Sequence, residues 1–223
     1  MTKFADMSAV IVANGEFPHK EYPLYLLKTA EYILCCDASS GLKHLERLGI
    51  APDLIVGDMD SCGEKTRRKL ADRLVQLVQI EEQDDNDLAK AMRVLRERRP
   101  DIKEIHILGA GGRNEAHAVG NLGWLMEWEM RYDFQKAGVC VDMVSDYSTA
   151  FAVSRDISLE IGEGRKISFF TCDPTLKICS EGLHWPLDQV VFDAWWKASL
   201  NRADSDSVTL RFSHRAPLLV ILD

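Results

Sequence analysis

The chain has 223 residues, of which 46% are hydrophobic and 28% are charged, a composition typical of a folded protein. Its 27 basic and 35 acidic side chains give a net charge of −8. This balance argues against nucleic acid and against an anionic membrane as the main partner, because both are bound by basic surfaces.

The cysteine pattern and the N-terminus bear on the cellular compartment. Six cysteines are present, without a CxxC pair or a zinc-type spacing. The N-terminus lacks the basic-then-apolar pattern of a signal peptide, and no apolar run approaches membrane-spanning length. We therefore expect reduced thiols and a cytoplasmic location.

Short apolar runs alternate with segments of helical spacing in the first two-thirds of the chain. The apolar runs are 9–13, 32–36, 54–56, 75–80, 105–108 and 139–144. The helical segments between them are 24–31, 42–48, 65–74, 88–95 and 117–128. This order predicts an α/β fold, with an N-terminal, mainly parallel sheet and helices on both of its faces.

The pattern changes from about Ile157 onward. Short runs with period-two alternation follow one another, separated by Gly, Pro and Asp turns, at 157–161, 166–171, 176–179, 208–212 and 218–222. They predict a smaller C-terminal β-sandwich. The expected domains are therefore residues 1–153 and residues 154–223.

Every early strand ends in glycine, a carboxylate or an amide. These ends carry Asn14, Asp37, Asp58 with Asp60, the acidic segment 81–87, and the turn 109–113. Ligands of open α/β sheets bind beyond the carboxyl ends of the strands. We expect these residues to converge on one edge of the sheet.

Asp58 and Asp60 follow the third apolar run. In extended backbone their side chains would point to the same side, about 7 Å apart. Two neighbouring carboxylates repel each other unless a cation lies between them, which favours a divalent metal with a phosphate beyond it. The alternative is a solvated acidic turn.

The segment 81–87 and the residues behind it also allow two interpretations. Asp84, Asp85 and Asp87 are either ligands or acids that cap the first turn of a helix. Lys90, three residues after Asp87, either pairs with that carboxylate on the helix surface or reaches a phosphate.

The turn Gly109-Ala110-Gly111-Gly112 is neither a dinucleotide fingerprint nor a P-loop. Its backbone N–H groups can still approach a phosphate, and the guanidinium of Arg113 can clamp phosphate oxygens. His117 and Asn121 either line the same edge or face partners inside the protein, and for His117 the second interpretation is favoured.

Three tryptophans, Trp185, Trp195 and Trp196, lie in the last third. For any one of them, packing in the core or in a dimer interface is the favoured interpretation. Trp185 follows Gly182-Leu183-His184 in a turn-like setting, where its indole could instead stack on a flat, cationic heteroaromatic ring.

The order of these motifs resembles the thiamine pyrophosphokinase family. The resemblance covers nearly the whole chain, and its most specific parts are GDxDS and QDxxDxxK. It is carried by Asp37, Pro-Asp-Leu-Ile-Val-Gly-Asp-Met-Asp-Ser at 52–61, Glu-Gln-Asp-Asp-Asn-Asp at 82–87 with Lys90, Gly-Gly-Arg at 111–113 and Gly-Leu-His-Trp at 182–185.

The resemblance implies an α/β nucleotide-binding catalytic domain and a β-sandwich domain for thiamine binding and dimerisation. It implies Mg²⁺-dependent transfer of the pyrophosphoryl group of ATP to the thiamine hydroxyl, giving thiamine diphosphate and AMP. A homodimer with sites at the subunit interface is also implied.

Roles for individual residues follow from the same resemblance. The implied catalytic residues and Mg²⁺ ligands are Asp58, Asp60, Asp84 and Asp87. The implied ATP-binding residues are Asn14, Asp37, Ser61, Lys90, Gly111, Gly112 and Arg113. The implied thiamine-binding residues are Gln83, Trp185, Ser199 and Asn201.

The chain departs from the family pattern at one corner. The family usually has Gly-Arg-x-Asp-His, whereas residues 112–117 read Gly-Arg-Asn-Glu-Ala-His, one residue longer and with Glu115 in place of Asp.

Two other functions are alternatives. One is a haloacid-dehalogenase-like phosphatase that uses an aspartate of the DxD motif as a nucleophile. Asp58-Met59-Asp60 fits that motif, although two strand–helix units precede it here. The other is a non-catalytic sensor of a nucleotide or thiamine.

Overall fold

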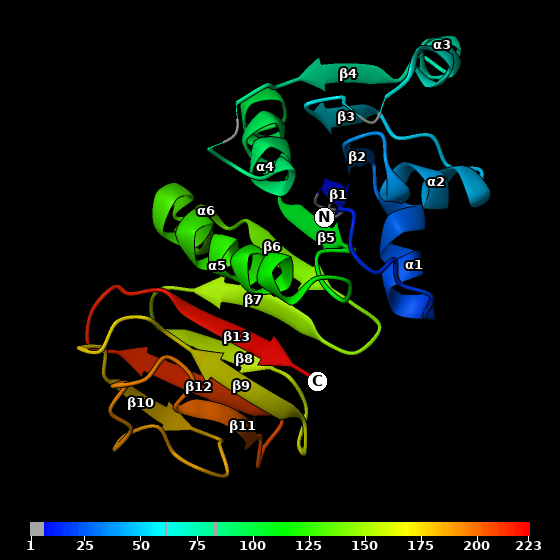
Figure 1. Cartoon of the computed structure of the whole chain (residues 1–223). Coiled ribbons are helices and arrows are strands. Elements are labelled where there is room, and N and C mark those ends of the chain that lie inside the picture. Colours follow the sequence, from blue (N-terminus) through cyan, green and yellow to red (C-terminus); the bar gives the residue numbers. More distant parts are fainter. Residues whose placement is uncertain (1–6, 61, 83) are drawn as a thin grey trace. The chain divides into compact units, whose positions relative to one another are not determined.

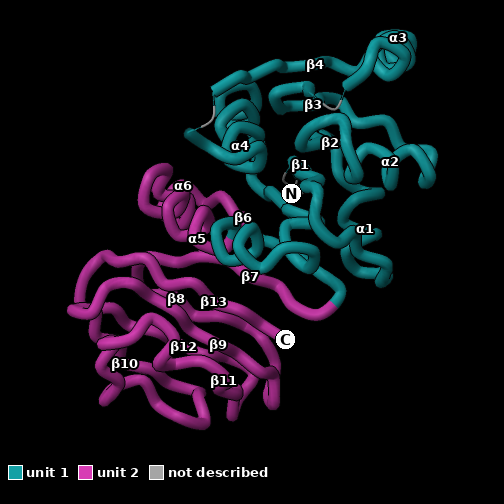
Figure 2. Tube along the Cα trace, viewed as in Figure 1, with its two compact units in different colours: residues 1–121, 143–146 teal, residues 122–142, 147–223 magenta. Residues whose placement is uncertain are grey.

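The computed structural model describes residues 7–60, 62–82 and 84–223. Ser61 and Gln83, two of the predicted ligand-binding residues, lie outside the described residues. The chain forms two compact units, unit 1 with residues 1–121 and 143–146 and unit 2 with residues 122–142 and 147–223 (Figure 2). These units are defined by how compactly the chain folds. The expected boundary after residue 153 separates two functional domains, and it stays a prediction.

Unit 1 contains a parallel sheet (Figure 1). Its parallel strands lie in the order β5-β1-β2-β3-β4, and β4 is the edge strand. The strands are β1 (Ser8–Val12), β2 (Tyr32–Cys36), β3 (Leu54–Gly57), β4 (Gln76–Gln79) and β5 (Glu104–Leu108). The predicted parallel sheet is confirmed.

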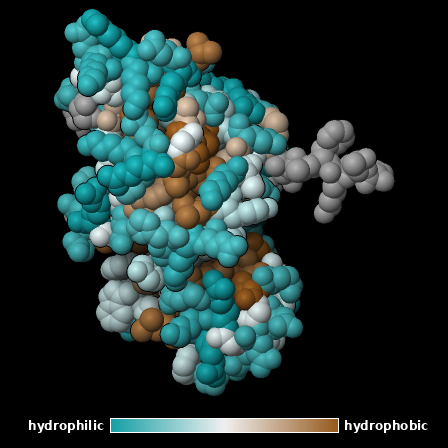
Figure 3. All heavy atoms as spheres, turned by 90° about the vertical axis from the view of Figure 1, so that its right-hand side faces the viewer, coloured by the Kyte–Doolittle hydropathy of each residue, from teal (hydrophilic) through white to brown (hydrophobic). Residues whose placement is uncertain are grey.

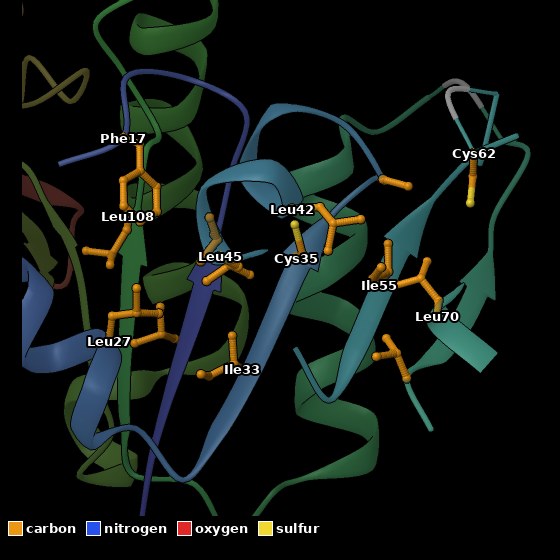
Figure 4. Close-up of a cluster of buried hydrophobic side chains, with 14 of the residues drawn as sticks. Phe17, Leu27, Ile33, Cys35, Leu42, Leu45, Ile55, Cys62, Leu70 and Leu108 are labelled. Carbon is orange, nitrogen blue, oxygen red and sulfur yellow. The ribbon is translucent and has the colours of Figure 1, made fainter. Parts of the chain in front are cut away.

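One face of this sheet packs against three helices, α1 (Glu21–Thr29), α2 (Ser40–Arg47) and α3 (Glu64–Asp72). Figure 4 shows the buried side chains of this layer, which come from both the strands and the helices. Among them are Leu27, Ile33, Leu45, Ile55 and Leu70, all less than 9% exposed.

The opposite face packs against α4 (Asp87–Arg98), which contacts β1, β2 and β3. Leu88, Ala91, Met92 and Leu95 of α4 are buried. Because alternate side chains of a strand point to opposite faces, both faces of this sheet are apolar. The prediction of helices on both faces is confirmed.

Three elements follow β5 in the chain: α5 (Glu115–Tyr132), α6 (Phe134–Ala137) and β6 (Cys140–Val144). Helix α5 begins in unit 1, and its residues from Leu122 onward belong to unit 2.

Unit 2 contains two antiparallel sheets that enclose one core. The strands lie in the orders β11-β9-β13-β7 and β10-β12-β8. Phe169 and Val220 of the first sheet share a buried cluster with Ile178 and Leu210 of the second. The strands are β7 (Thr149–Val153), β8 (Ile157–Glu160), β9 (Lys166–Phe170), β10 (Ile178–Glu181), β11 (Ala198–Arg202), β12 (Ser207–Phe212) and β13 (Leu218–Leu222).

The predicted C-terminal sandwich is confirmed, but strand β11 was not expected. Its sequence, Ala-Ser-Leu-Asn-Arg, has no β-branched or aromatic residue, and its pairing with β9 shifts register between Ala198 and Asn201. Tertiary pairing therefore decides the conformation of this segment.

On the face shown in Figure 3, hydrophilic residues dominate and hydrophobic residues gather in patches between them. Among the described residues, none of the helices has the length and apolar character that crossing a membrane requires.

Candidate active site

A cavity of about 500 Å³ lies in unit 1 at the carboxyl ends of the parallel strands. The ends of β1, β2, β3 and β5 and the start of α4 all contribute to its wall. The predicted residues that line it are Asn14, Asp58, Asp84, Asp87, Lys90, Gly111 and Arg113. These strand ends therefore converge as expected, whereas Asp37, Asp60 and Gly112 do not line the cavity.

The backbone between Asp58 and Asp60 is not extended, so that part of the expectation is wrong. Met59 has a φ of 63°, in the left-handed region, and its side chain is buried in the core of unit 1. Asp58 lines the cavity, whereas Asp60 is exposed and donates its backbone N–H to Asp58 Oδ1 at 3.1 Å.

Asp37 ends β2 beside the end of β3. Its φ is 56°, its side chain is buried, and its backbone N–H donates to the Val56 carbonyl at 2.7 Å. Gly57 is required by this close approach, because a Cβ there would lie 3.1 Å from Asp37 Cα.

The N-cap of α4 is Asn86, not one of the neighbouring aspartates. Asn86 Oδ1 accepts from the Ala89 N–H at 2.9 Å, and Asn86 Nδ2 donates to Asn121 Oδ1 at 2.9 Å. Asp84 and Asp87 are therefore not needed as the cap, and both line the cavity.

Lys90 is only 2% exposed, although it carries a charge. Its Nζ donates to the Ile80 carbonyl at 3.3 Å and lies 3.8 Å from Asp87 Oδ1. Both sequence interpretations of Lys90 are compatible with this position, since the residue pairs with Asp87 and also lines the cavity.

Burial raises the pKa of Asp87 above its ordinary value. The positive charge of Lys90 opposes this shift, and the negative charges of Asp37 and Asp58 add to it. Asp87 therefore senses other carboxylates at the same edge of the sheet, which is a setting that favours a bound cation.

The carboxylates of the cavity fit a hard divalent cation whose shell is completed by a ligand. Asp58, Asp84 and Asp87 supply oxygen donors to one cavity. In the described part of the chain, no three His, Cys, Asp or Glu side chains are arranged to hold a metal by themselves. Magnesium commonly uses only one or two carboxylates, together with substrate phosphates and water.

The glycine turn after β5 packs against the loop after β1. The N–H of Gly15 donates to the Gly109 carbonyl at 2.6 Å, and the N–H of Glu16 donates to the Gly111 carbonyl at 2.7 Å. A Cβ at Gly15 would overlap both of these carbonyl oxygens. The glycines thus allow two backbone segments to meet at the edge of the cavity.

Asn14 and Arg113 are joined at the same place. Arg113 Nη1 donates to the Asn14 carbonyl at 3.3 Å and to Ser40 Oγ at 3.1 Å. The Asn14 side chain donates to the Cys36 carbonyl at 3.0 Å and accepts from the Gly41 N–H at 3.2 Å. Asn14 therefore holds the ends of β1 and β2 together, and Arg113 is exposed beside it.

Sequence reasoning missed Asn114, and it left the positions of His117 and Asn121 open between the cavity and the protein interior. Asn114 accepts from the His117 N–H at 3.1 Å and so caps α5, and Asn121 donates to the Ala110 carbonyl at 2.7 Å. Asn114, His117 and Asn121 all line the cavity, so the favoured interpretation of His117 as facing partners inside the protein is wrong. The cap signal of Asn114 before a long helix was available in the sequence.

Two helices thus begin at this cavity, α4 at Asn86 and α5 after Asn114. The N–H groups and the dipole of a helix N-terminus favour bound anions. Together with Lys90 and Arg113, they supply positive potential to the cavity that the carboxylates also line.

Unit 2 has a smaller pocket of about 300 Å³. It is lined by Trp185, Pro186, Leu187, Val190, Lys197, Ala198, Ser199, Leu200 and Asn201. The three predicted thiamine-binding residues of this unit, Trp185, Ser199 and Asn201, are therefore brought together. Trp185 is 57% exposed, so core packing does not apply to it.

Asn201 fixes the backbone that carries Trp185. Its Nδ2 donates to the Trp185 carbonyl at 2.7 Å, and its Oδ1 accepts from the Trp185 N–H at 3.2 Å. Asn201 is 5% exposed. Next to it, Leu200 has a φ of 61° and donates its N–H to Ser168 Oγ at 2.9 Å, which leaves the Leu200 side chain exposed at the pocket.

Two family models match the chain. The model described as thiamin pyrophosphokinase, catalytic domain, matches residues 24–139, and the model described as thiamin pyrophosphokinase, substrate-binding domain, matches residues 150–216. A comparison with curated protein sequences finds no match.

Solved structures share the fold. A thiamine pyrophosphokinase from Bacillus subtilis is similar with a TM-score of 0.74 and 23% identity, over 97% of this chain and 98% of that chain. The yeast enzyme has a TM-score of 0.75 at 14% identity, over 100% of this chain and 88% of that chain. The Candida albicans enzyme has a TM-score of 0.73 at 15% identity, over 97% of this chain and 88% of that chain.

Proposed function

The chain belongs to the thiamin pyrophosphokinase family, and from this membership we propose which of its residues carry the reaction. Its activity is that of the family, the transfer of a pyrophosphoryl group from ATP to thiamine in the presence of a metal. Neither the phosphatase nor the non-catalytic sensor finds support in the similarities.

The cavity of unit 1 binds ATP and the metal in this proposal. The observation that carries it is the meeting of Asp58, Asp84 and Asp87 with Arg113 and the glycine turn in one cavity. We assign Mg²⁺ to the carboxylates Asp58, Asp60, Asp84 and Asp87. The ion supplies charge neutralisation for the phosphate oxygens when bound.

The other residues of unit 1 position the nucleotide. Lys90 and Arg113 balance the charge of the phosphates, and the N-termini of α4 and α5 add to their effect. Asn14 and Asp37 hold the ends of β1 and β2 in place at the cavity. Phosphoryl transfer depends mainly on positioning and electrostatic stabilisation, so this inventory of groups suffices.

The pocket of unit 2 binds thiamine in this proposal. The exposed indole of Trp185 offers a flat face to a cationic ring, and Ser199 lies on the same pocket wall. Asn201 acts as a positioning residue, since its amide is bonded to both backbone groups of Trp185.

Three further features belong to the proposal. The functional domains are residues 1–153 and 154–223, the protein acts in the cytoplasm, and it forms a homodimer with sites at the subunit interface. The exposed Trp185 and Leu200 support the dimer, because large apolar side chains gather at such interfaces. Sedimentation analysis is expected to give twice the mass of one chain, and a monomer at assay concentrations would contradict it.

The decisive experiment is incubation of the pure protein with ATP, Mg²⁺ and thiamine. We expect AMP and thiamine diphosphate in equal amounts, with no AMP when thiamine or the metal is left out. Inorganic phosphate without AMP would indicate a phosphatase, and binding without turnover would indicate a sensor.

A further inference from the structure

We infer that Arg93 is a positioning residue for the loop that carries Asp84, an inference that rests on the proposed role of Asp84. Arg93 lies on α4, and its guanidinium reaches two carboxylates of the preceding loop. Nη1 donates to Asp85 Oδ2 at 3.2 Å, and Nη2 donates to Glu82 Oε1. These two partners lie on either side of Asp84 in the chain.

The guanidinium of Arg93 is carried by a rigid helix. Helix α4 is capped by Asn86 and packs its apolar side on the sheet through Met92 and Leu95, both 0% exposed. Lys90 lies three residues before Arg93, and residues with this spacing are neighbours on a helix surface. Lys90 donates to Ile80 at the start of the same loop, so one side of α4 contacts the loop at both its start and its middle.

The loop needs such a contact because of its charge. Residues 81–87 contain five carboxylates, Glu81, Glu82, Asp84, Asp85 and Asp87. Like charges so close together repel one another and spread the loop. A hydrogen bond to Glu82 raises the pKa of Arg93, which keeps the guanidinium charged.

Arg93 binds the carboxylates on either side of Asp84 in the chain. Glu82 and Asp85 are bonded to Arg93, and Asp85 also lines the cavity together with Asp84 and Asp87. A planar guanidinium can hold two carboxylates in fixed directions, which a single ammonium group does less well. Arg93 thereby sets where the backbone at Asp84 lies.

This role concerns position more than stability. The side chains of Arg93, Glu82 and Asp85 are 34%, 40% and 23% exposed, and exposed ion pairs contribute little to folding. A displacement of about 1 Å in a catalytic group, by contrast, can reduce the rate about a hundredfold.

The test compares Arg93→Gln with Arg98→Gln, a matched change on the same helix, where Arg98 Nη1 donates to Gln76 Oε1 at 2.9 Å. For Arg93→Gln we expect kcat/KM to fall by about tenfold to a hundredfold. The Mg²⁺ concentration that gives half-maximal rate is expected to rise, while the melting temperature stays near that of the wild type. Arg93→Lys is expected to recover part of the lost kcat/KM, because lysine restores the positive charge but not the planar guanidinium that binds two carboxylates.

Several outcomes would overturn the inference. One is an Arg93→Gln variant with the kinetics of Arg98→Gln. Another is recovery of activity when Asp85→Asn is added to Arg93→Gln, which would show that charge balance alone matters. If Arg93→Gln melts well below the wild type, Glu82→Ala decides, since it removes one of the two acceptors of Arg93: lower activity at unchanged melting temperature supports the inference, and wild-type kinetics overturn it.

Hydrogen exchange separates this inference from the proposed function. Amides of peptide 80–88 are expected to exchange faster in Arg93→Gln than in Arg98→Gln, measured without substrates. If exchange is faster in Arg93→Gln but the wild type releases no AMP, the contact between Arg93 and the loop is supported and only the proposed function is overturned. Equal exchange with an active wild type would overturn the positioning role alone.

Discussion

The cavity of unit 1 and the pocket of unit 2 differ in both chemistry and construction. The cavity is lined by carboxylates, amides, glycines and two cations from several loops that are far apart in the sequence. The pocket is lined mainly by apolar side chains from two short segments, 185–190 and 197–201. A polar site assembled from many strand ends suits phosphates and a metal, whereas a small apolar site suits a flat ring.

The largest difference between the two sites is expected when a negative charge is removed from the cavity. Asp58→Asn is expected to lower kcat by about a hundredfold or more, because a metal-binding carboxylate contributes several kcal/mol to charge stabilisation in the transition state. Steady-state AMP release measures the effect, and Asp72→Asn, on the exposed side of α3, is the control. A kcat within threefold of the wild type would remove Asp58 from the mechanism.

The matching change in the pocket is Trp185→Ala. We expect KM for thiamine to rise about tenfold while KM for ATP is unchanged, because a cation stacked on an indole gains on the order of 1 kcal/mol or more. Trp196→Ala is a suitable control, since Trp196 is 54% exposed and does not line the pocket. Equal effects on both KM values would contradict a pocket that serves thiamine alone.

Asn201→Ala tests whether Asn201 acts on thiamine through Trp185. It removes both bonds to the backbone of Trp185, so KM for thiamine is expected to rise a few-fold and the melting temperature to fall, as the loss of buried hydrogen bonds costs about 1–3 kcal/mol. Combining it with Trp185→Ala should add little to KM, because both changes act through the same indole. Full additivity in KM would show that Asn201 contacts thiamine independently.

The smallest expected effect concerns a carboxylate of unit 2 that lies outside the pocket. Hydrogen bonds from Thr175, and then from His214, lower the pKa of Asp173 from 3.8 to about 2. A lowered pKa in the folded state means that ionised Asp173 stabilises the fold above about pH 4 and that this contribution is lost as the pH falls toward 2. Asp173→Asn should therefore melt slightly below the wild type at pH 7.

Thermal melts at several pH values test this expectation. The difference in melting temperature between the wild type and Asp173→Asn is expected to shrink between pH 4 and about 2, while kinetics at pH 7 stay unchanged. A difference that does not depend on pH would mean that the charge of Asp173 is not what stabilises this turn.

The sequence alone determined the order of α1 to α5 and β1 to β6, the change to an antiparallel sandwich and the polar strand ends. Hydrophobic periodicity is a local property, so α1 to α4 and β1 to β5 could be predicted within a few residues of their observed bounds. The rule that parallel strands present their carboxyl ends at one edge then brought Asn14, Asp58 and Asp84 together.

Only the tertiary structure decided the details on which the chemistry depends. The backbone turns at the buried Met59 between Asp58 and Asp60, and pairing with β9 makes a strand of Ala198–Arg202 despite its composition. The bonds from Asn201 to Trp185 and from Arg93 to the acidic loop join residues that no local pattern connects. Packing and long-range hydrogen bonds fix these features, because their energies depend on neighbours that are distant in the sequence.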